Sequence, residues 1–397
     1  MSDELAQSEA RHRGRGLKRH SALRMLLASS VAVALVIGLG TVFFYRHLNE
    51  NLTVLDIAGK VGERPDRVAP GKPINVLVMG SDSRSGDQGV EQMENGGARS
   101  DTTILMHLSS DRKFAYGVSL PRDAVVDRPK CKTDDGEVPA EQAAMFNSAF
   151  YYGGVACTVK TVESLTGVRI DHWVVVNFNG FKDMVDAIGG VEVCVPTKID
   201  DDRYQMHLDA GNQKIKGQTA LDYVRVRHGL GDGSDIGRMK RQQTFVASMA
   251  AQVVSAGTLT RVDRLVKFLD AATKSLALDT GVNNVVSLAR LGNQFRNIGL
   301  DNIQFITVPF EWYEPDPNRI VWNTKLSDQL WKKVRADQPL TRRLSADAIS
   351  AQEQASPGSS PSPSPTGSPS GTPSPAKPSK SSSDEAKAQA EANGLCT

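Results

Sequence analysis

The stretch DHWVVVNFNGFKDMVDAIGGVEVCV (171–195) indicates the fold class most directly. Its first part, 171–178, is rich in valine and aromatic residues and predicts a β-strand. Residues 180–190 predict a helix capped by glycine, and the valines of 191–195 predict a second strand. A strand, a helix and a strand in direct succession are typical of an α/β protein.

The same alternation extends toward the N-terminus. Residues 74–80, 102–108 and 114–120 are short β-rich runs bounded by turn residues, and 143–167 predicts one or two helices stopped by Gly167. We therefore expect a mixed central β-sheet with helices on both faces. Ligands in such folds gather where strands end and where loops or helices begin.

An apolar segment near the N-terminus predicts a membrane anchor. The 21 residues from Met25 to Tyr45 include no charged side chain, and a helix of this length is about 30 Å long, enough to cross a bilayer. A cleaved signal peptide would have a shorter apolar core and an Ala-x-Ala-like site. The basic residues before the segment favour a cytoplasmic N-terminus, and they are Arg11, Arg13, Arg15, Lys18, Arg19 and Arg24. We expect a single-pass protein in the cell membrane, with everything from Arg46 onward outside the cytoplasm.

Composition divides the chain into five parts. We expect a basic cytoplasmic tail, a transmembrane helix, an extracytoplasmic connector, a catalytic domain and a disordered tail, at residues 1–24, 25–45, 46–71, 72–337 and 338–397. The last part includes 356–383, where 12 of 28 residues are serine and 8 are proline, a composition that cannot form a packed core.

The charge balance argues against a nucleic-acid partner. Lys+Arg number 47 and Asp+Glu 45, a formal net charge of +2, whereas a nucleic-acid-binding domain usually has a clear basic excess. The basic stretch 223–243 is therefore a local feature.

The cysteines fit an oxidising compartment. All four follow the apolar segment, at positions 131, 157, 194 and 396, and none has CxxC spacing. Three pairings are possible. We favour Cys131–Cys157, which would join a loop to the helix that follows it; Cys194 could instead be a buried thiol.

Arginine and aspartate occur together at three predicted strand boundaries. A single pair of this kind would be read as a surface ion pair, but three pairs indicate a shared site. The pairs are Asp82 with Arg84 in MGSDSR, Arg99 with Asp101 in ARSD, and Arg122 with Asp123 in VSLPRD. Carboxylates suit Mg²⁺, and arginines bind phosphate oxygens. The mixture points to a metal-bridged phosphate or pyrophosphate.

The stretch YVRVRHGLGDGSDIGRMKRQQ (223–243) supplies a second group of cations. Arg225 and Arg227 would point to nearly opposite sides of a continuous helix, so both can face one ligand only if the chain becomes extended near Arg225. Ser234 or Asp235 is expected to cap a helix that starts near Ile236.

That second helix has two expected faces. One is a buried stripe formed by Ile236, Met239, Val246, Met249 and Val253. The other carries Arg238, Arg241 and Gln242, which could converge with the helix start on an anion. GDGSD lacks the full calcium-loop pattern and is expected to be a turn.

The ordered motifs MGSDSR, RSDTTIL, VSLPRD, NFNGFKDMVDAIGGVEV, LDYVRVRH and GRMKRQQ resemble the LytR-CpsA-Psr family of cell-wall glycopolymer ligases. The resemblance covers roughly residues 72–255, with weaker similarity to about 335. The Ser/Pro-rich tail with its Cys396 is similar to that of actinobacterial members.

The resemblance implies a phosphotransferase. It would move a glycopolymer from a polyprenyl-pyrophosphate carrier to a peptidoglycan hydroxyl, forming a phosphodiester and releasing polyprenyl phosphate. Asp82 and Asp101 would hold Mg²⁺, with Mn²⁺ as a substitute. The catalytic candidates are Arg99, Asp101, Arg122 and Asp123, the last as a base or as a partner that orients Arg122. The pyrophosphate would be bound by Arg84, Arg99, Arg122, Arg225, Arg227, Arg238, Arg241 and Gln242.

Two other functions stay open at this point. The same site could hydrolyse polyprenyl pyrophosphate with water as acceptor, or the chain could be a non-catalytic envelope regulator or binding protein. The chain also departs from many relatives at MFNSAF (145–150), where they carry a lysine and a tyrosine.

Overall fold

The computed structural model describes residues 14–82, 87–202, 206–226, 234–255 and 261–351. The chain divides into two compact units, Met1–Asn51 and Leu52–Thr397. In the first, the helix α2 (Gly14–Glu50) has 37 residues, about 55 Å. Its segment Leu23–Glu50 is long and apolar enough, by length and composition, to cross a membrane, which fits the expected anchor but extends past the expected end at Tyr45.

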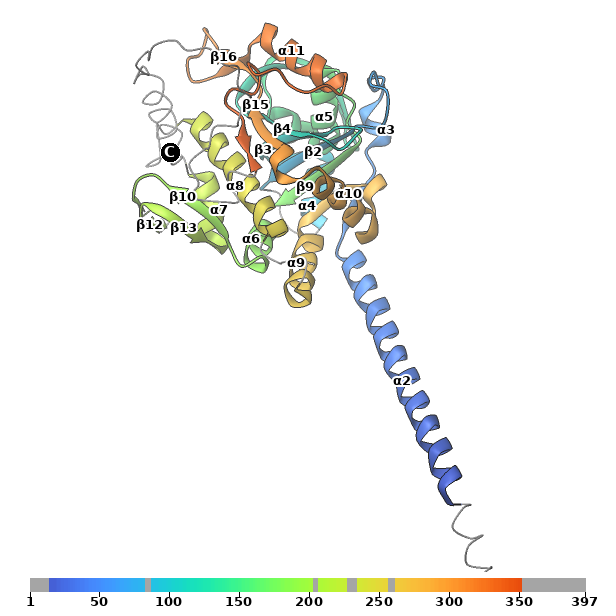
Figure 1. Ribbon diagram of the computed structural model, residues 1–397. Coiled ribbons are helices and arrows are strands. Elements are labelled where there is room, and N and C mark those ends of the chain that lie inside the picture. The colour runs from blue at the N-terminus through green and yellow to red at the C-terminus, as the bar shows by residue number, and fades with distance from the viewer. Residues whose placement is uncertain (1–13, 83–86, 203–205, 227–233, 256–260, 352–397) are drawn as a thin grey trace, which may run out of the picture. The chain divides into compact units, whose positions relative to one another are not determined.

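The second unit is built on a mixed sheet of eight strands (Figure 1). Parallel and antiparallel neighbours alternate along most of it; β2 is parallel to β9 and antiparallel to β3. The strands, in sheet order, are β1 (Thr53–Leu55), β14 (Leu276–Asp279), β9 (His172–Asn177), β2 (Ile74–Ser81), β3 (Ser100–Leu108), β4 (Ala115–Leu120), β15 (Ile303–Thr307) and β18 (Ile349–Ser350).

Helices cover both faces of this sheet, as the sequence predicts. Successive side chains of a strand point to opposite faces, so Leu77 packs in one core with Val159 of α5 (Ser148–Thr166), and Val76 packs in another with Ala247 of α8 (Asp235–Ser255). The first face is also covered by α3 (Ala58–Val61) and α11 (Thr324–Arg335), and the second by α10 (Val285–Ile298). The short α4 (Asp87–Asn95) packs against α5.

A second sheet of four strands lies beside the first and corrects one prediction. Its order is β16 (Phe310–Trp312), β17 (Ile320–Trp322), β5 (Ala124–Arg128) and β8 (Glu141–Met145). The predicted helix 143–167 therefore begins only at Ser148, because residues 141–145 pair with β5 and this tertiary pairing overrides their helix propensity. The helix is kinked at Gly153 and Gly154 and ends at Gly167, with φ +62°, as expected.

The strand–helix–strand prediction is confirmed for 171–195, but its two strands belong to different sheets. β9 lies in the central sheet, whereas β10 (Val191–Val195), beyond α6 (Phe178–Ala187), pairs with β13 (Gly211–Ile215). This outer layer shares a core with α8 through Phe245. It also contains β11 (Ile199–Asp201), β12 (Met206–Leu208), α7 (Gly217–Arg225) and, against α6, α9 (Val262–Ser275).

The position of α8 between two layers corrects the expected buried stripe. Met239 is buried, but Val246, Met249 and Val253 are only partly so. Phe245 packs into the outer layer and Ala247 onto the central sheet, so the helix has two buried sides.

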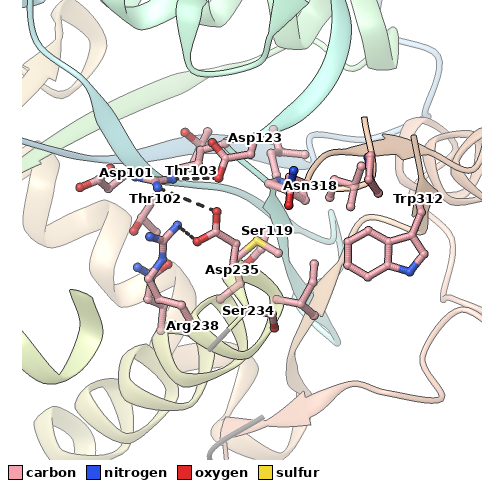
Figure 2. Close-up of a pocket in the computed structure, with 18 residues that line it drawn as sticks. Asp101, Thr102, Thr103, Ser119, Asp123, Ser234, Asp235, Arg238, Trp312 and Asn318 are labelled. Carbon is pink, nitrogen blue, oxygen red and sulfur yellow. Dashed lines mark hydrogen bonds and ion pairs between the residues drawn. The ribbon is translucent and has the colours of Figure 1, made fainter. Parts of the chain in front are cut away.

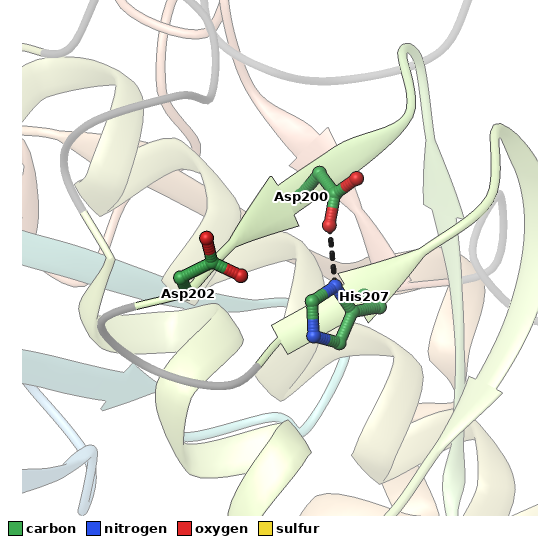
Figure 3. A group of neighbouring side chains, drawn as sticks. All are labelled: Asp200, Asp202 and His207. Carbon is green, nitrogen blue, oxygen red and sulfur yellow. Dashed lines mark hydrogen bonds and ion pairs between the residues drawn. The ribbon is translucent and has the colours of Figure 1, made fainter.

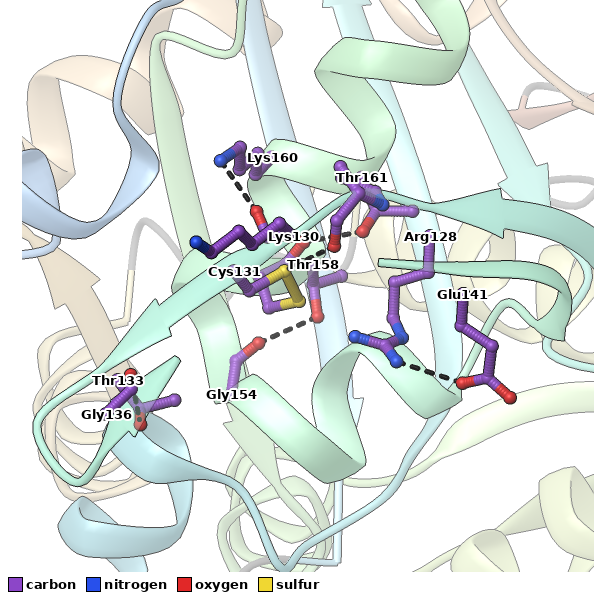
Figure 4. The surroundings of a disulfide bond; sticks show 12 residues. Arg128, Lys130, Cys131, Thr133, Gly136, Glu141, Gly154, Thr158, Lys160 and Thr161 are labelled. Atoms are coloured by element: carbon purple, nitrogen blue, oxygen red, sulfur yellow. Dashed lines mark hydrogen bonds and ion pairs between the residues drawn. A yellow bond between two sulfur atoms is a disulfide. The ribbon is translucent and has the colours of Figure 1, made fainter. Parts of the chain in front are cut away.

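The disulfide between Cys131 and Cys157 is confirmed and spans 26 positions of the chain. It joins β6 (Cys131–Thr133), one strand of a hairpin with β7 (Gly136–Val138), to α5 (Figure 4). Cys194 is disulfide-bonded too, so the alternative of a free buried thiol is wrong. Cys396 lies outside the described residues.

Candidate functional site

A cavity of about 360 Å³ lies where β3 and β4 meet the start of α8 and the hairpin of β16 and β17 (Figure 2). Charged, polar and apolar side chains all line it. The lining residues are Asp101, Thr102, Thr103, Ser119, Leu120, Pro121, Arg122, Asp123, Ser234, Asp235, Ile236, Arg238, Met239, Gln242, Trp312, Pro317, Asn318 and Ile320.

Asp101 reaches the cavity through an irregularity in the central sheet. The pairing of β2 with β3 shifts register between Gly80 and Ser81, and Asp101 is the residue of β3 left without a partner on β2. Such a bulge bends the strand and re-aims the extra side chain. The Asp101 side chain is 20% exposed and accepts a hydrogen bond from Nη1 of Arg122.

The Pro-Arg-Asp segment is held by backbone hydrogen bonds. The N–H of Ala124 donates to the carbonyl of Pro121 at 3.2 Å, which forms a turn, and the N–H of Asn147 donates to the carbonyl of Arg122 at 3.0 Å. Asn147 belongs to MFNSAF (145–150), the motif that differs from that of many relatives. Its backbone N–H therefore helps to hold Arg122 in place whatever side chains the motif carries.

Three carboxylates surround the Arg122 guanidinium. Besides Asp101, Nε lies 3.3 Å from Oδ2 of Asp123, and Nη2 lies 3.9 Å from Oδ2 of Asp235. The Arg122 side chain is 18% exposed. Burial lowers the pKa of Arg122, but the carboxylates raise it more, so the net direction is upward and the group stays charged.

The start of α8 supplies the opposite wall. Ser234 is the cap, since its Oγ accepts the N–H of Gly237 at 3.1 Å, so Asp235 faces the cavity and pairs with Arg238 at 3.1 Å. Arg238 is 4% exposed, and burial lowers its pKa. A buried guanidinium next to a cavity is suited to bind an anion that enters.

Two glutamines of α8 fix it against its neighbours. Gln242, which lines the cavity, donates to the carbonyl of Val224 at 3.0 Å. Gln243, which the sequence analysis missed, donates to Oγ of Ser119 at 2.8 Å and to Oγ1 of Thr307 at 3.0 Å. Gln242 thus joins α8 to the end of α7, and Gln243 joins α8 to the ends of β4 and β15.

Asp123 has the most perturbed acidity in the cavity. Burial and its hydrogen bond with Asp235 raise the pKa of Asp123 from 3.8 to about 6, despite the opposing effect of Arg122. The negative charge of Asp235 also disfavours ionisation of Asp123. A carboxyl with a pKa near neutrality can accept a proton at physiological pH.

The predicted residues separate into three sets. Asp101, Arg122, Asp123, Arg238 and Gln242 line the cavity. Arg84 and Arg227 lie outside the described residues. Asp82, Arg99, Arg225 and Arg241 are described but do not line it.

The residues of the third set have other contacts. Asp82 accepts the N–H of Arg99 at 2.7 Å, and the Arg99 side chain lies over the ring of Tyr151. Arg225 is exposed and stacks 4.6 Å from the centroid of Phe178. The chain does become extended at Val226 (ψ 138°), as expected, and Arg241 donates to the carbonyl of that residue.

Asp235, Trp312 and Asn318 line the cavity, but no sequence motif indicates them as functional residues. The sequence predicts Asp235 only as a helix cap. Trp312 and Asn318 come from a hairpin nearly 200 residues after Asp123, which no local motif connects to the site.

The carboxylates of the site suit a hard cation. Asp101 lies on the rim of the cavity, and Asp82 lies at the paired end of the neighbouring strand with only one oxygen engaged by the Arg99 N–H. The cavity brings the carboxylates of Asp101, Asp123 and Asp235 together with the guanidiniums of Arg122 and Arg238. Carboxylate oxygens are ligands that Mg²⁺ prefers, so Asp101 and Asp82 are the residues that would hold the ion that the family resemblance implies.

A different acidic group lies on the hairpin of β11 and β12. Asp200, Asp202 and His207 bring one ligand atom each within 4.8 Å of one another, and His207 pairs with Asp200 (Figure 3). All three are exposed, and none lines the cavity.

The chain matches the model of the LytR_cpsA_psr family over residues 46–336. It is 32% identical over 317 residues to "Cell wall biosynthesis protein LcpA" of Corynebacterium glutamicum, a match that covers 73% of this chain and 60% of that protein. It is 27% identical over 291 residues to "Polyisoprenyl-teichoic acid--peptidoglycan teichoic acid transferase TagV" of Bacillus subtilis, covering 70% of this chain and 69% of that protein.

Solved structures share the fold. A LytR-Csp2A-Psr enzyme from Actinomyces oris aligns with a TM-score of 0.55 at 20% identity, over 72% of this chain and 96% of that one. TagT bound to LI-WTA aligns with a TM-score of 0.52 at 25% identity, over 72% of this chain and all of that one.

Proposed function

Because the chain belongs to the LytR-CpsA-Psr family, we propose that it transfers a glycopolymer from a polyprenyl-pyrophosphate carrier to a hydroxyl of peptidoglycan. The printed name of the TagV relative, with its polyisoprenyl-linked donor and peptidoglycan acceptor, supports this reaction class. The apolar helix α2 would anchor the enzyme in the cell membrane, with its N-terminus in the cytoplasm and the cavity outside, where both substrates occur.

The proposed reaction replaces the phosphoanhydride bond of the carrier pyrophosphate with a new phosphoester bond. The acceptor hydroxyl oxygen forms a bond to the phosphorus that carries the glycan. The bond from that phosphorus to the bridging oxygen breaks, and its electron pair leaves with polyprenyl phosphate. The hydroxyl proton passes to a base, and the product is a phosphodiester between glycan and peptidoglycan.

Positioning and charge carry most of the work in such a transfer. Arg238 lies buried at the wall of the cavity and would bind phosphate oxygens there. Arg122 would exchange part of its contact with the three carboxylates for phosphate oxygens, to which its fork of donors is equally suited. Mg²⁺ or Mn²⁺ bound by Asp82 and Asp101 would add positive charge against the pyrophosphate.

Asp123 is the proposed base. Its pKa of about 6 leaves it mostly ionised at neutral pH while keeping an appreciable proton affinity. Asp235 would steer that proton through the hydrogen bond that the two carboxyls share.

The observation that carries the proposal is the Arg122 guanidinium held among three carboxylates beside the buried Arg238. The test is to incubate the full chain, in detergent, with a lipid-pyrophosphate glycan, Mg²⁺ and peptidoglycan, and then to separate polyprenyl phosphate from glycan-linked peptidoglycan. Arg122→Ala should abolish transfer, whereas Arg261→Ala, at a side chain that is 58% exposed directly before α9, should not.

The same assay distinguishes the alternatives. Polyprenyl phosphate released equally with and without peptidoglycan would indicate a hydrolase. Binding of the donor without any turnover would indicate a regulator or binding protein. Full transfer by Arg122→Ala would show that the reaction does not take place at the proposed site.

A further inference from the structure

The cavity has an aromatic side that phosphate chemistry does not require. Trp312 lines it and is 61% exposed, whereas Trp173 and Trp331 are 3% and 2% exposed. Figure 2 shows the indole on the side of the cavity away from Arg238. Tryptophan is highly buried on average, so a large exposed indole beside a charged site indicates a binding surface.

The indole is held in place by the strand that carries it. Its residue pairs with Ile320 across the hairpin, and Phe310, two positions earlier on the same side of β16, contacts it edge to face at 6.5 Å. Phe310 in turn packs against the main core. The ring is therefore presented by a supported strand.

The loop between β16 and β17 is fixed by its own hydrogen bonds. Asp316 accepts the N–H of Asn318 at 3.0 Å and Nε of Arg319 at 2.9 Å, and the N–H of Tyr313 donates to the carbonyl of Arg319 at 3.0 Å. This loop places Pro317 and the carboxamide of Asn318 beside the indole in the cavity wall.

The hairpin is also joined to the reacting end of the site. β17 runs parallel to β5, and Ile320 pairs with Ala124, the residue directly after Asp123. The distance from the indole to the proposed base is therefore set by a sheet pairing.

We propose that Trp312 is the stacking platform for a sugar ring of a substrate, with Asn318 beside it as a hydrogen-bonding group. The inference rests on the proposed function and deepens it. The apolar C–H face of a pyranose packs on the electron-rich face of an indole, while an amide serves the ring hydroxyls at the edge. The charged side of the cavity holds phosphate, and the aromatic side holds the adjoining sugar. Trp312 and Asn318 therefore select which sugar is joined.

The sugar can come from the donor glycan or from the peptidoglycan acceptor, and kinetics separates the two. Trp312→Ala should raise KM about tenfold, the size expected for one lost aromatic contact, for the substrate whose sugar stacks there. Trp312→Phe, which keeps a ring, should recover most of the loss. Tyr152→Ala is the matched control, because Tyr152 is an aromatic residue that is 50% exposed but does not line the cavity.

A binding measurement tests the contact without turnover. A soluble peptidoglycan disaccharide and a short-chain pyrophosphate-linked glycan should each be titrated into the full chain while acrylamide quenching of tryptophan fluorescence is recorded. The sugar that stacks should protect the exposed indole in the wild type, and Trp312→Phe should lose that protection.

The outcomes of the two proposals differ. If the wild type transfers glycan and Trp312→Ala leaves both KM values and the quenching response unchanged, the stacking inference is wrong and the proposed function stands. If the wild type binds the sugars with protection of the indole but transfers nothing, the stacking inference stands and the proposed function fails.

Discussion

Asp235→Asn should lower the pKa of Asp123 and so move the acid limb of the pH–rate profile. In the native cavity, burial and the hydrogen bond with Asp235 raise this pKa from 3.8 to about 6. Asparagine keeps the size of the side chain and can donate an N–H to the Asp123 carboxylate, which stabilises the charged form. Its carbonyl oxygen can still accept from Arg238.

The expected change in the pKa of Asp123 follows from the separate effects of burial and of Asp235. The native perturbation corresponds to about 3 kcal/mol of preference for the protonated carboxyl. Burial is the larger cause and persists in the variant, whereas the charge of Asp235 and its hydrogen bond with Asp123 disappear. We therefore expect the acid limb to fall by about one pH unit, which gives about fivefold higher activity at pH 5 relative to the plateau.

The sign is fixed by the role of the base. A base works ionised, so the native rate falls as the pH drops through about 6, and a lower pKa extends activity toward acid. The assay is kcat/KM for transfer at fixed Mg²⁺, from about pH 4.5 to about pH 8. Asp263→Asn, at a side chain that is 62% exposed outside the cavity, is the control.

A folded Asp235→Asn enzyme whose acid limb does not move would show that Asp235 does not raise the pKa of Asp123. A limb that persists in Asp123→Asn would equally show that another group carries the titration. Thermal unfolding of both variants separates these results from a loss of structure, since Arg238 is buried and loses part of its charge compensation in Asp235→Asn.

Four further outcomes are expected. Arg122→Lys should keep the positive charge but lose the forked donors, lowering kcat/KM at least about 100-fold with an unchanged circular dichroism spectrum. Cys157→Ser should reduce the free energy of unfolding by about 3 kcal/mol in denaturant titrations, and reducing the wild type should lower it at least as much, because it also breaks the disulfide of Cys194. Gly154→Ala should destabilise by at least about 2 kcal/mol, because φ is +60° and a Cβ would lie 2.0 Å from a backbone oxygen, whereas Gly59→Ala has open space. Asp101→Asn should raise the Mg²⁺ concentration for half-maximal transfer at least about tenfold, measured in chelator-buffered assays.

The sequence predicts those strands and helix ends that depend only on neighbouring residues in the chain. Strands such as β2 are alternating or continuous apolar runs that end at glycine or polar turns, and α5 ends at a glycine that takes a left-handed conformation. The sequence predicts a helix for residues 143–145, but they form a strand. Their pairing with β5 depends on a partner about 20 residues earlier, which the local pattern does not indicate. The separate sheet of β10 and β13 could not be inferred from the strand–helix–strand order alone.

The same division applies to the site. Asp101, Arg122 and Asp123 could be found because charged residues next to strand ends are visible in the sequence. Their mutual contacts could not, because the bulge that turns Asp101 toward Arg122 depends on the register between two strands. Trp312 enters through the parallel pairing of β17 with β5, a contact between segments nearly 200 residues apart.

The pairing of Ile320 with Ala124 has an evolutionary consequence. Selection can change the length and composition of residues 313–319 while β17 keeps its place against β5, because that pairing involves only residues after the loop. The residues that carry out the reaction beside Asp123 and the surface around Trp312 can therefore change independently while the pairing of β17 with β5 is kept. Duplicated genes could come to use different polymers through changes in residues 313–319 alone, while Arg122 and Asp123 stay the same.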